Sequence, residues 1–551
     1  MSDMTPLLRV ESLSVAFAQR KTVDAISFGL LRGRCLGVIG ESGAGKTQLF
    51  LALLGLLPPQ ADVTGRAFLG NTSLIGALVG AGAREVRGRR AAMIFQDPMT
   101  ALTPHLRIGD QVAEPLVAHH GKSWTEARAE AVRLLGRVRL TDAAGLARRY
   151  PHELSGGMRQ RATIAMALAG TPELLIADEP TTALDVSVQT GILALLRELV
   201  TDGMTLAVIT HDMGVIAGLA DDVLVMRSGK AVEQGTVDAV LKTPRDGYTR
   251  ALLSATPRMD EPVEPAPVPA VLAESVPLSA RHVSVRYPVP RGPFRRAQVF
   301  LAVDAVSLSV APGEALGIVG ESGSGKSSLT RALLRLSADA SGQIAWLGRE
   351  VHALRGETLR ALRDRAQIVF QDPFASLDPV MTVAEIVAEP LRALRPALDA
   401  AARAERVAQL LDGVGLDATY LGRRSRELSG GQNQRVAIAR AMVIEPQLLV
   451  CDEAVSALDV SVQAQVLELL ASFKRTRGTS IVFVSHNLAV VRRLCDRVLV
   501  MYQGKVVEEG DAAEVFAAPR HPYTRLLLES VPRLDPAAER ARLAAHAADS
   551  A

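Results

Sequence analysis

Cysteine is scarce in this sequence, with three residues, Cys35, Cys451 and Cys495, in a chain of 551. The three lie far apart and form no CxxC pair, so their spacing argues against a zinc site and against a disulfide framework. Cys35 and Cys451 stand inside apolar runs, where a cysteine acts as a small core side chain rather than as a reactive thiol. This usage is typical of proteins of the reducing cytoplasm.

Long hydrophobic runs are also lacking. The strongest candidate, residues 49–57, ends at Pro58 and Pro59 and is far shorter than the roughly 20 apolar residues that cross a bilayer. The first residues carry neither the basic segment nor the apolar run of a secretory signal. We therefore expect no membrane span and no secretory signal, and we assign the hydrophobic residues, 48% of the chain, to cores and docking surfaces.

An excess of charge of either sign is missing too. Lysine and arginine number 62 against 59 aspartates and glutamates, which gives a formal charge of +3. Proteins that bind nucleic acid concentrate positive charge, so this balance argues against nucleic acid as the main partner. The charged fraction of 22% and the length of the chain are those of a globular protein with about two to four domains.

The chain does contain a long internal repeat. Gln371 follows Gln96 by 275 residues and Asp452 follows Asp178 by 274, each within a matching motif. Two homologous domains in tandem explain such a constant offset. The motif pairs are GESGAGKT (40–47) and GESGSGKS (320–327), FQDP (95–98 and 370–373), LSGG (154–157 and 428–431), LLIADE (174–179) and LLVCDE (448–453), and ALDVSVQ (183–189 and 457–463).

Composition sets the boundaries of the domains. The proline-rich stretch at 256–278 cannot continue a helix or a central strand, which predicts a semi-rigid linker. The first domain is then 1–255 and the second 279–532, each with a C-terminal extension. The tail at 533–551 is rich in alanine and arginine, which predicts a frayed or helical surface extension without an assigned role.

Each domain is expected to have an α/β fold. Short aliphatic runs that end at polar loops, such as 174–178 and 206–210, alternate with helical patterns. Runs without a polar face predict strands buried on both sides, and therefore a mostly parallel sheet between helices. Residues around 104–150 and 379–425 predict a helical insert in each domain.

A glycine-rich loop follows an apolar strand and opens a helix in each domain, in the pattern GxxxxGK[ST]. The backbone N–H groups of such a loop bind phosphates, its lysine reaches the β- and γ-phosphates, and its hydroxyl contacts Mg²⁺. One match could be a mere glycine-rich turn, but two in the same context predict two ATP sites. The residues are Gly40, Gly43, Gly45, Lys46 and Thr47 in the first domain, and Gly320, Gly323, Gly325, Lys326 and Ser327 in the second.

Paired acids at the end of a buried strand predict hydrolytic chemistry. Asp178 and Asp452 would hold Mg²⁺, directly or through water. Glu179 and Glu453, which follow them, would polarise the attacking water as general bases. A single acid at this place could simply cap the next helix, but that explanation is weak for a pair.

Two further pairs of side chains gain meaning only from the repeat. His211 and His486 each end a run of strand-forming residues, where a histidine can touch a γ-phosphate, although a lone one would more often be structural. Gln96 and Gln371, taken singly, would be surface loop residues. We predict that all four lie at the ATP sites.

The LSGG motif opens a helix in each domain and offers a serine donor, so it is either a second anion site or a helix cap. The order of P-loop, glutamine, LSGG, Asp-Glu strand, Ala-Leu-Asp loop and histidine resembles a pair of fused ABC-transporter ATPase domains, over nearly the whole chain outside the linker and tail. The resemblance implies a mostly parallel sheet core, an antiparallel β part and a helical subdomain in each domain, with ATP and Mg²⁺ as cofactors.

The same resemblance assigns roles to particular residues. It implies that the two domains pack head to tail and share each nucleotide. The signature residues would complete the ATP site on the opposite P-loop, Ser429 and Gly431 that of Lys46, and Ser155 and Gly157 that of Lys326. Phe17 and Tyr287 match the aromatic residue that stacks on adenine. The implied Mg²⁺ set is Thr47, Ser327, Gln96, Gln371, Asp178 and Asp452.

The FQDP motifs and the extensions at 244–257 and 519–532 narrow the resemblance to the ATPases of peptide and nickel importers. This implies a subunit that energises import of dipeptides, oligopeptides, glutathione or nickel complexes from the cytoplasmic face of the inner membrane. Its partners would be two integral membrane permease subunits and an extracytoplasmic solute-binding protein. We expect no nucleic-acid partner, and no iron–sulfur cluster, because the cysteines that some members carry are absent.

The sequence departs from the pattern of this subgroup at two places. Asp246 and Gly247 replace His-Pro in the first extension, and Asn433 replaces the usual arginine after the second signature. The main alternative function is a tandem ABC ATPase that acts on ribosomes, but the linker of such proteins is typically long, helical and charged. DNA-repair ATPases carry zinc-binding cysteine clusters that this sequence lacks, and a regulatory ATPase without transport is a third interpretation.

Overall fold

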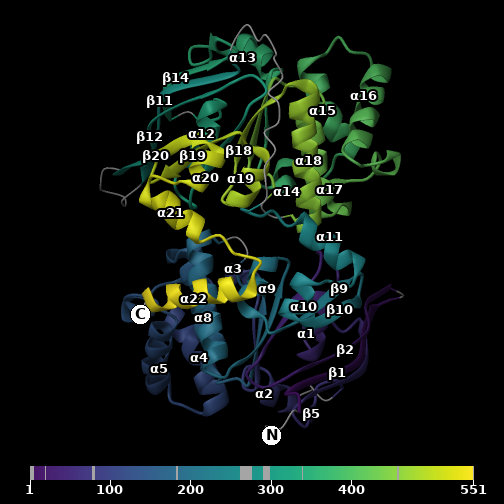
Figure 1. The fold of residues 1–551 in the computed structure, drawn as a ribbon, viewed down its shortest axis with the longest axis vertical. Helices are drawn as coiled ribbons and strands as arrows, with labels where there is room; N and C mark the ends of the chain where they lie inside the picture. Colours follow the sequence, from purple (N-terminus) through teal and green to yellow (C-terminus); the bar gives the residue numbers. More distant parts are fainter. Residues whose placement is uncertain are drawn as a thin grey trace. The chain divides into compact units, whose positions relative to one another are not determined.

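A computed structural model describes residues 5–18, 20–76, 81–181, 184–260, 276–289, 298–337, 339–455 and 458–549. Contacts within the chain divide it into two units, which Figure 1 shows in ribbon form. Unit 1 consists of Met1–Leu184, Val188–Thr256 and Pro532–Ala551, and unit 2 of Asp185–Ser187 and Pro257–Val531. Residues 261–275, which make up most of the expected linker, lie outside the described residues.

A six-stranded sheet forms the centre of unit 1. Its order is β10 (Lys230–Thr236), β9 (Asp222–Arg227), β3 (Cys35–Ile39), β8 (Thr205–Thr210), β7 (Leu174–Asp178) and β6 (Ala91–Ile94). All pairs are parallel except β10 with β9. Every residue of β3, β7 and β8 is buried, as expected for apolar strands covered on both faces, so the predicted mostly parallel sheet is confirmed.

A second sheet of unit 1 is antiparallel. Its order is β2 (Arg20–Leu30), β1 (Leu8–Phe17), β4 (Ala61–Leu69) and β5 (Thr72–Ser73). Leu13 and Val15 of β1 share a buried core with Phe50 of the helix α1 (Lys46–Leu53) and with Val38 of β3. The strand that precedes the P-loop and the helix that follows it are therefore packed into the same core.

The helices of unit 1 cover the parallel sheet and form the helical insert. The helical prediction for residues 104–150 is confirmed, because the insert contains the helices α4 (Ile108–His120), α5 (Trp124–Arg137) and α6 (Ala143–Leu146). Ser123 begins α5 with a capping box, because its Oγ accepts from the N–H of Glu126 while Glu126 accepts from the N–H of Ser123. The other helices are α2 (Ala81–Val86), α3 (Pro98–Ala101), η1 (Pro151–Glu153), α7 (Gly156–Ala169), α8 (Val186–Thr201), α9 (Met213–Leu219), α10 (Val237–Lys242), α11 (Gly247–Ala255) and α22 (Pro536–Asp549).

Unit 2 repeats both sheets. The mostly parallel sheet has the order β16 (Ala366–Val369), β17 (Leu448–Asp452), β18 (Ser480–Val484), β13 (Ala315–Val319), β19 (Arg497–Tyr502) and β20 (Lys505–Asp511). The antiparallel sheet has the order β12 (Gln298–Val310), β11 (Leu278–Val289), β14 (Ala340–Trp346) and β15 (Arg349–Glu350). The P-loop strands β3 and β13 hold the same place, each between two parallel neighbours.

The helices of unit 2 follow the same plan, and the insert helices α15 and α16 confirm the helical prediction for 379–425. None of the helices in the described ranges is both long and apolar enough to cross a bilayer. The helices are α12 (Lys326–Leu333), α13 (Gly356–Arg363), α14 (Pro373–Ser376), α15 (Val383–Leu394), α16 (Ala400–Gly413), η2 (Ala418–Tyr420), η3 (Ser425–Glu427), α17 (Gly430–Met442), α18 (Val460–Arg477), α19 (Leu488–Leu494), α20 (Ala512–Ala517) and α21 (Pro522–Glu529).

The C-terminal tail differs from the expectation of a surface extension. Its residues form α22, whose Leu543 is fully buried within the larger core of unit 1. The prediction of a helix is confirmed, but that helix is packed on one face rather than frayed. The three cysteines are buried thiols, as predicted for Cys35 and Cys451.

Candidate active site

Both P-loops connect a buried strand to the first turn of a helix. In unit 1 the loop leaves β3 after Ile39 and enters α1 at Lys46. Gly45 has a left-handed backbone with φ of 91°, and a Cβ there would lie 2.4 Å from the carbonyl oxygen of Thr22. Gly325 repeats this with φ of 103° and a distance of 2.2 Å to the oxygen of Ala302. Only glycine fits these positions, because both the backbone angle and the space exclude a side chain.

The P-loop lysines are buried and held by the loop itself. Lys46 Nζ donates to the carbonyl oxygens of Gly40 at 2.6 Å and Glu41 at 2.9 Å. Lys326 Nζ makes the corresponding two bonds, both at 2.8 Å. Burial lowers the pKa of Lys326, although the nearby carboxylates of Glu453 and others oppose the shift. A buried ammonium ion in the first turn of a helix suits a phosphate group.

A buried aspartate faces the hydroxyl at the end of each P-loop. Burial raises the pKa of Asp178 to about 6, while a hydrogen bond with Thr47 works in the opposite direction. Asp178 Oδ1 is buried and has no hydrogen-bond partner in the described part of the chain. In unit 2, Ser327 Oγ donates to Asp452 Oδ1 at 3.1 Å, and burial again raises the pKa of the carboxyl.

These oxygen ligands fit Mg²⁺, which prefers carboxylate and hydroxyl oxygens. The unpartnered Oδ1 of Asp178 is the observation that supports the fit, because a buried carboxylate oxygen without a partner is unfavourable on its own. Bound Mg²⁺ would neutralise charge on the phosphates. The residues that would hold Mg²⁺ are Thr47 with Asp178 in unit 1 and Ser327 with Asp452 in unit 2.

Two predicted side chains converge on the carboxylate of a third predicted residue, Glu179, in unit 1. Gln96 Nε2 donates to Glu179 Oε2 at 2.9 Å, and His211 Nδ1 lies 3.2 Å from Glu179 Oε1. The backbone N–H of Glu179 donates to Ile209 at the adjacent strand end, at 2.8 Å. Glu179 has a left-handed backbone with φ of 46°, a conformation that costs a non-glycine residue about 1 kcal/mol and is common at functional sites.

The same arrangement recurs in unit 2. Gln371 Nε2 donates to Glu453 Oε2 at 2.6 Å, and His486 Nδ1 lies 3.6 Å from Glu453 Oε1. The interaction with His486 lowers the pKa of Glu453, so that this carboxylate is ionised at neutral pH as a general base must be. The φ of Glu453 is 48°. Glutamine, glutamate and histidine are thus brought together in both halves, and their role at an ATP site stays a prediction.

The signature residues have a structural role within their own units. Ser155 caps α7, and its Oγ accepts from the N–H of Met158 at 3.4 Å. A Cβ at Gly157 would lie 2.3 Å from Val188 Cγ1, so a glycine is needed where α7 meets α8. Ser429 and Gly431 repeat the cap and the close approach in unit 2. Their expected part in an ATP site stays a prediction.

The departure at Asn433 preserves a contact. Arg159, the corresponding residue of unit 1, donates from Nε to the carbonyl oxygen of Pro151 at 2.7 Å. The fully buried Asn433 donates from Nδ2 to the carbonyl oxygen of Ser425, the counterpart of Pro151, at 2.9 Å. The shorter side chain therefore still ties the start of α17 to the turn that precedes it.

The expected adenine-stacking residues lie at strand positions. Phe17 ends β1 and is half-buried against the core of the antiparallel sheet. Tyr287 lies in β11, and its hydroxyl donates to Ser328 Oγ at 3.3 Å, next to the P-loop residue Ser327. The stacking role of both residues stays a prediction.

Two tyrosines at the P-loops were missed by the sequence analysis. Tyr248 Oη accepts from the N–H of Glu41 at 3.1 Å, and Tyr523 Oη accepts from the N–H of Glu321 at 2.9 Å. Each comes from the C-terminal extension of its own unit, so the extension braces the loop. The repeated Tyr-Thr-Arg at 248–250 and 523–525 was the available signal.

The other departure from the subgroup pattern, Asp246 in the first extension, also preserves a structural role, that of a helix cap. Asp246 caps α11 and accepts from the N–H of Tyr248 at 2.7 Å. His521 caps α21 in unit 2, where its Nδ1 accepts from the N–H of Tyr523 at 3.2 Å. Aspartate and histidine thus present an equivalent acceptor, and both place the tyrosine that braces the P-loop.

Known proteins resemble this chain in both halves. A family model described as ABC transporter matches residues 23–182 and 303–456, and one described as oligopeptide/dipeptide transporter, C-terminal region, matches 232–276 and 507–550. The glutathione import ATP-binding proteins GsiA of Shigella sonnei (strain Ss046) and Escherichia coli (strain K12) are each 44% identical to it, over 98% of this chain and 91% of their own. The solved post-hydrolysis dimer of the ATP-binding cassette MJ0796, bound to ADP and Pi, is 28% identical, with a TM-score of 0.39, over 43% of this chain and 98% of that one.

Proposed function

The chain belongs to the ABC transporter family of ATPases, and on that premise we propose that it hydrolyses ATP to power an importer of glutathione or other short peptides. The support for peptide-type cargo is twofold. Relatives of nearly the same length are named for glutathione import, and the C-terminal region named for oligopeptide and dipeptide transporters occurs after both ATPase domains. A nickel-type cargo has no such support.

In this proposal each glutamate acts as the general base of its half. Glu179 would accept the proton of the attacking water through the carboxylate that Gln96 and His211 hold in place. Lys46 would turn its ammonium group to the β- and γ-phosphates. In unit 2 the corresponding roles of base, supporting side chains and phosphate ligand would fall to Glu453, to Gln371 with His486, and to Lys326. Mg²⁺ would be held by the hydroxyl and aspartate pairs already described.

Family resemblance supports a shared nucleotide at each site. Ser429 and Gly431 would complete the site of Lys46, and Ser155 and Gly157 would complete the site of Lys326. Phe17 and Tyr287 would stack on the adenine rings. ATP binding would then close the pair of domains and hydrolysis would reopen it, and two separate permease subunits at the inner membrane would follow this cycle. An extracytoplasmic binding protein would deliver the solute.

One observation carries the proposal: glutamine, glutamate and histidine meet in both halves, each beside an intact P-loop, in a chain with the peptide-type extension twice. The test is uptake of labelled glutathione and labelled dipeptides by cells that carry the chain or its Glu179→Gln/Glu453→Gln variant. Glu85→Gln, at an exposed helical position, is the matched control. We expect the double variant alone to lose uptake.

Gentle solubilisation of native membranes provides the second arm of the test. Two multi-span proteins and a solute-binding protein should co-purify with the tagged chain. Co-purifying ribosomes, with unchanged peptide uptake in the double variant, would overturn the importer while leaving the ATPase chemistry in place.

A further inference from the structure

The last residues of the chain belong to unit 1, although they follow unit 2 in sequence. The helix α22, yellow in Figure 1, lies beside α9 of unit 1. Leu543 is fully buried there, and so is the carboxylate of Glu539, which pairs with Arg542 at 2.6 Å. Burying a charged group costs free energy unless the group is paired and well packed. The buried pair of Glu539 and Arg542 therefore indicates that this face of α22 is packed against unit 1.

The helix α9 is shaped to receive this tail. A Cβ at Gly214 would lie 2.4 Å from Pro532 Cβ, and a Cβ at Gly218 would lie 2.8 Å from Leu543 Cδ1. The corresponding positions of α19 in unit 2 are Ala489 and Arg493. Side chains of that size would collide with the tail, so the two glycines make room for it in unit 1 only.

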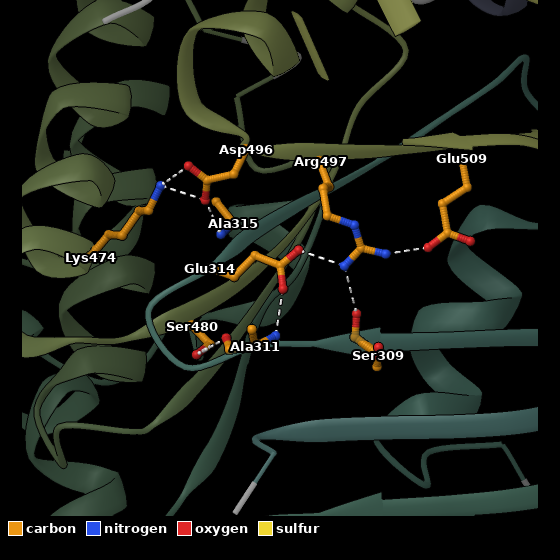
Figure 2. A network of polar contacts seen from close by, with 9 residues as sticks. All are labelled: Ser309, Ala311, Glu314, Ala315, Lys474, Ser480, Asp496, Arg497 and Glu509. Carbon is orange, nitrogen blue, oxygen red and sulfur yellow. Dashed lines mark hydrogen bonds and ion pairs between the residues drawn. The ribbon is translucent and has the colours of Figure 1, made fainter. Parts of the chain in front are cut away.

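In unit 2 an aspartate, Asp496, holds the start of the strand that leads into the P-loop. In Figure 2, Lys474 Nζ donates to both carboxylate oxygens of Asp496, at 2.6 Å each. Asp496 Oδ2 in turn accepts from the N–H of Ala315 at 2.8 Å, and the N–H of Asp496 donates back to Ala315. Ala315 begins β13, the strand that carries the second P-loop. The buried ammonium group of Lys474 thus holds Asp496 in place, and Asp496 in turn holds the start of β13.

Unit 1 has the same aspartate and strand but not the same cation. Asp221 Oδ2 accepts from the N–H of Cys35, the first residue of β3, at 2.9 Å. The position of Lys474, counted from the shared Asp-Val-Ser-Val-Gln segment, is Val200 in unit 1. Instead, Arg540 of α22 reaches Asp221 Oδ1 at 3.1 Å and donates to the carbonyl oxygen of Ala220. Arg197 lies farther away, at 3.7 Å.

We propose that α22 is a built-in positioning element of the first ATPase domain, in which Arg540 supplies the cation that Lys474 supplies in the second. Arg540 holds Asp221, Asp221 holds Cys35, and β3 leads into the first P-loop. The first ATP site therefore depends on the C-terminal end of the chain, whereas the second is complete without it. This asymmetry goes beyond the proposed function and is independent of the cargo.

Hydrogen exchange on the full chain tests the proposal, because β3 and β13 act as internal controls for each other. In Arg540→Ala, we expect exchange in the peptide that covers β3 to accelerate about tenfold, the effect of losing one charge-assisted hydrogen bond, with β13 unchanged. Lys474→Ala should do the reverse. Arg533→Ala, which removes an exposed arginine of the same tail, should change neither strand.

Rescue separates positioning from general stability. Arg540→Lys should restore most of the protection of β3, and Val200→Lys added to Arg540→Ala should supply the cation from the place that unit 2 uses. With the second site silenced by Glu453→Gln, Arg540→Ala should raise the KM for ATP severalfold more than it lowers kcat. Unchanged exchange at β3, equal acceleration in both strands, or failure of both rescues would overturn the proposal.

Discussion

At the residue scale, Glu179 and Glu453 combine a strained backbone with a carboxylate held from two sides. Replacing either by glutamine keeps the shape of the side chain and removes its basicity. We expect hydrolysis at the altered site to fall about a hundredfold or more while ATP still binds, since general bases contribute roughly 10²–10⁴. Single-turnover hydrolysis and equilibrium binding of labelled ATP measure the two properties separately, and full turnover in the double variant would refute the assignment.

The buried carboxyl of Asp178 makes a prediction about pH. Its pKa is raised from an ordinary 3.8 to about 6, so the folded chain binds this proton more tightly than the unfolded chain. The contribution of the group to stability therefore falls as the pH rises from about 4 to about 6 and is unfavourable above that window, by about 2–3 kcal/mol. Asp178→Asn should raise the melting temperature of the nucleotide-free chain at pH 8.

The same variant should show that gain shrinking as the pH falls toward 4, where the aspartate of the parent chain is itself protonated. Hydrolysis at the first site should be lost, because an amide oxygen is a poorer ligand for Mg²⁺ than a carboxylate. Thermal melts across the pH range check the first statement. A gain in stability independent of pH would show that the ionised carboxyl is not the cause.

At the element scale, the C-terminal extensions brace the P-loops through Tyr248 and Tyr523. Tyr248→Phe keeps the ring and leaves the N–H of Glu41 without this acceptor, so the loop should become less ordered. We expect the KM for ATP at the first site to rise about threefold to tenfold, in line with one lost hydrogen bond of about 0.5–1.5 kcal/mol. The measurement is steady-state hydrolysis in a Glu453→Gln background, which leaves only the first site active.

The reciprocal pair is its control. Tyr523→Phe in a Glu179→Gln background should show the same rise at the second site. Tyr248→Phe in that background should leave the second site unchanged, because each tyrosine contacts the loop of its own unit. A rise in both backgrounds would mean that the extensions act on the whole chain rather than on one loop.

The elements themselves were largely predictable from the sequence. Apolar runs such as 174–178 have no polar face, so a strand buried on both sides was the natural conclusion, and the helical inserts followed from their composition. The repeat singled out Gln96, His211 and Glu179 as site residues, but it did not predict that the first two contact the third. Tyr248 and Asp221 escaped because a single hydroxyl or carboxylate that binds a distant backbone N–H leaves no local pattern.

The tail shows most clearly what local pattern leaves out. Its alanine-rich composition predicts a helix, but the partner of that helix, α9, lies more than three hundred residues earlier in the sequence. The usable clue was a difference between the repeats: Gly214 and Gly218 stand where Ala489 and Arg493 stand in the second half. A repeat that loses side-chain volume in one copy indicates that something packs there, and the structure identifies it as α22.

At the scale of the whole molecule, the two copies of the predicted hydrolytic residues raise the question of which signature serves which P-loop. The resemblance implies that Ser155 serves the site of Lys326. Ser155→Arg would then place a bulky cation where the second nucleotide should be completed, so hydrolysis should fail at the Lys326 site and persist at the Lys46 site. Ser429→Arg should give the opposite result.

Trapping of a photoreactive ATP analogue, followed by mapping of the labelled P-loop peptide, reads the two sites separately in one experiment. Met158→Leu, a substitution of similar volume beside Ser155, controls for disturbance of the start of α7. If Ser155→Arg removes label from the Lys46 peptide instead, each half completes its own site and the head-to-tail arrangement is wrong. If it removes label from the Lys326 peptide alone, each signature acts on the nucleotide of the other half. ATP binding would then draw the two halves together, which is the step that an importer can couple to its permeases.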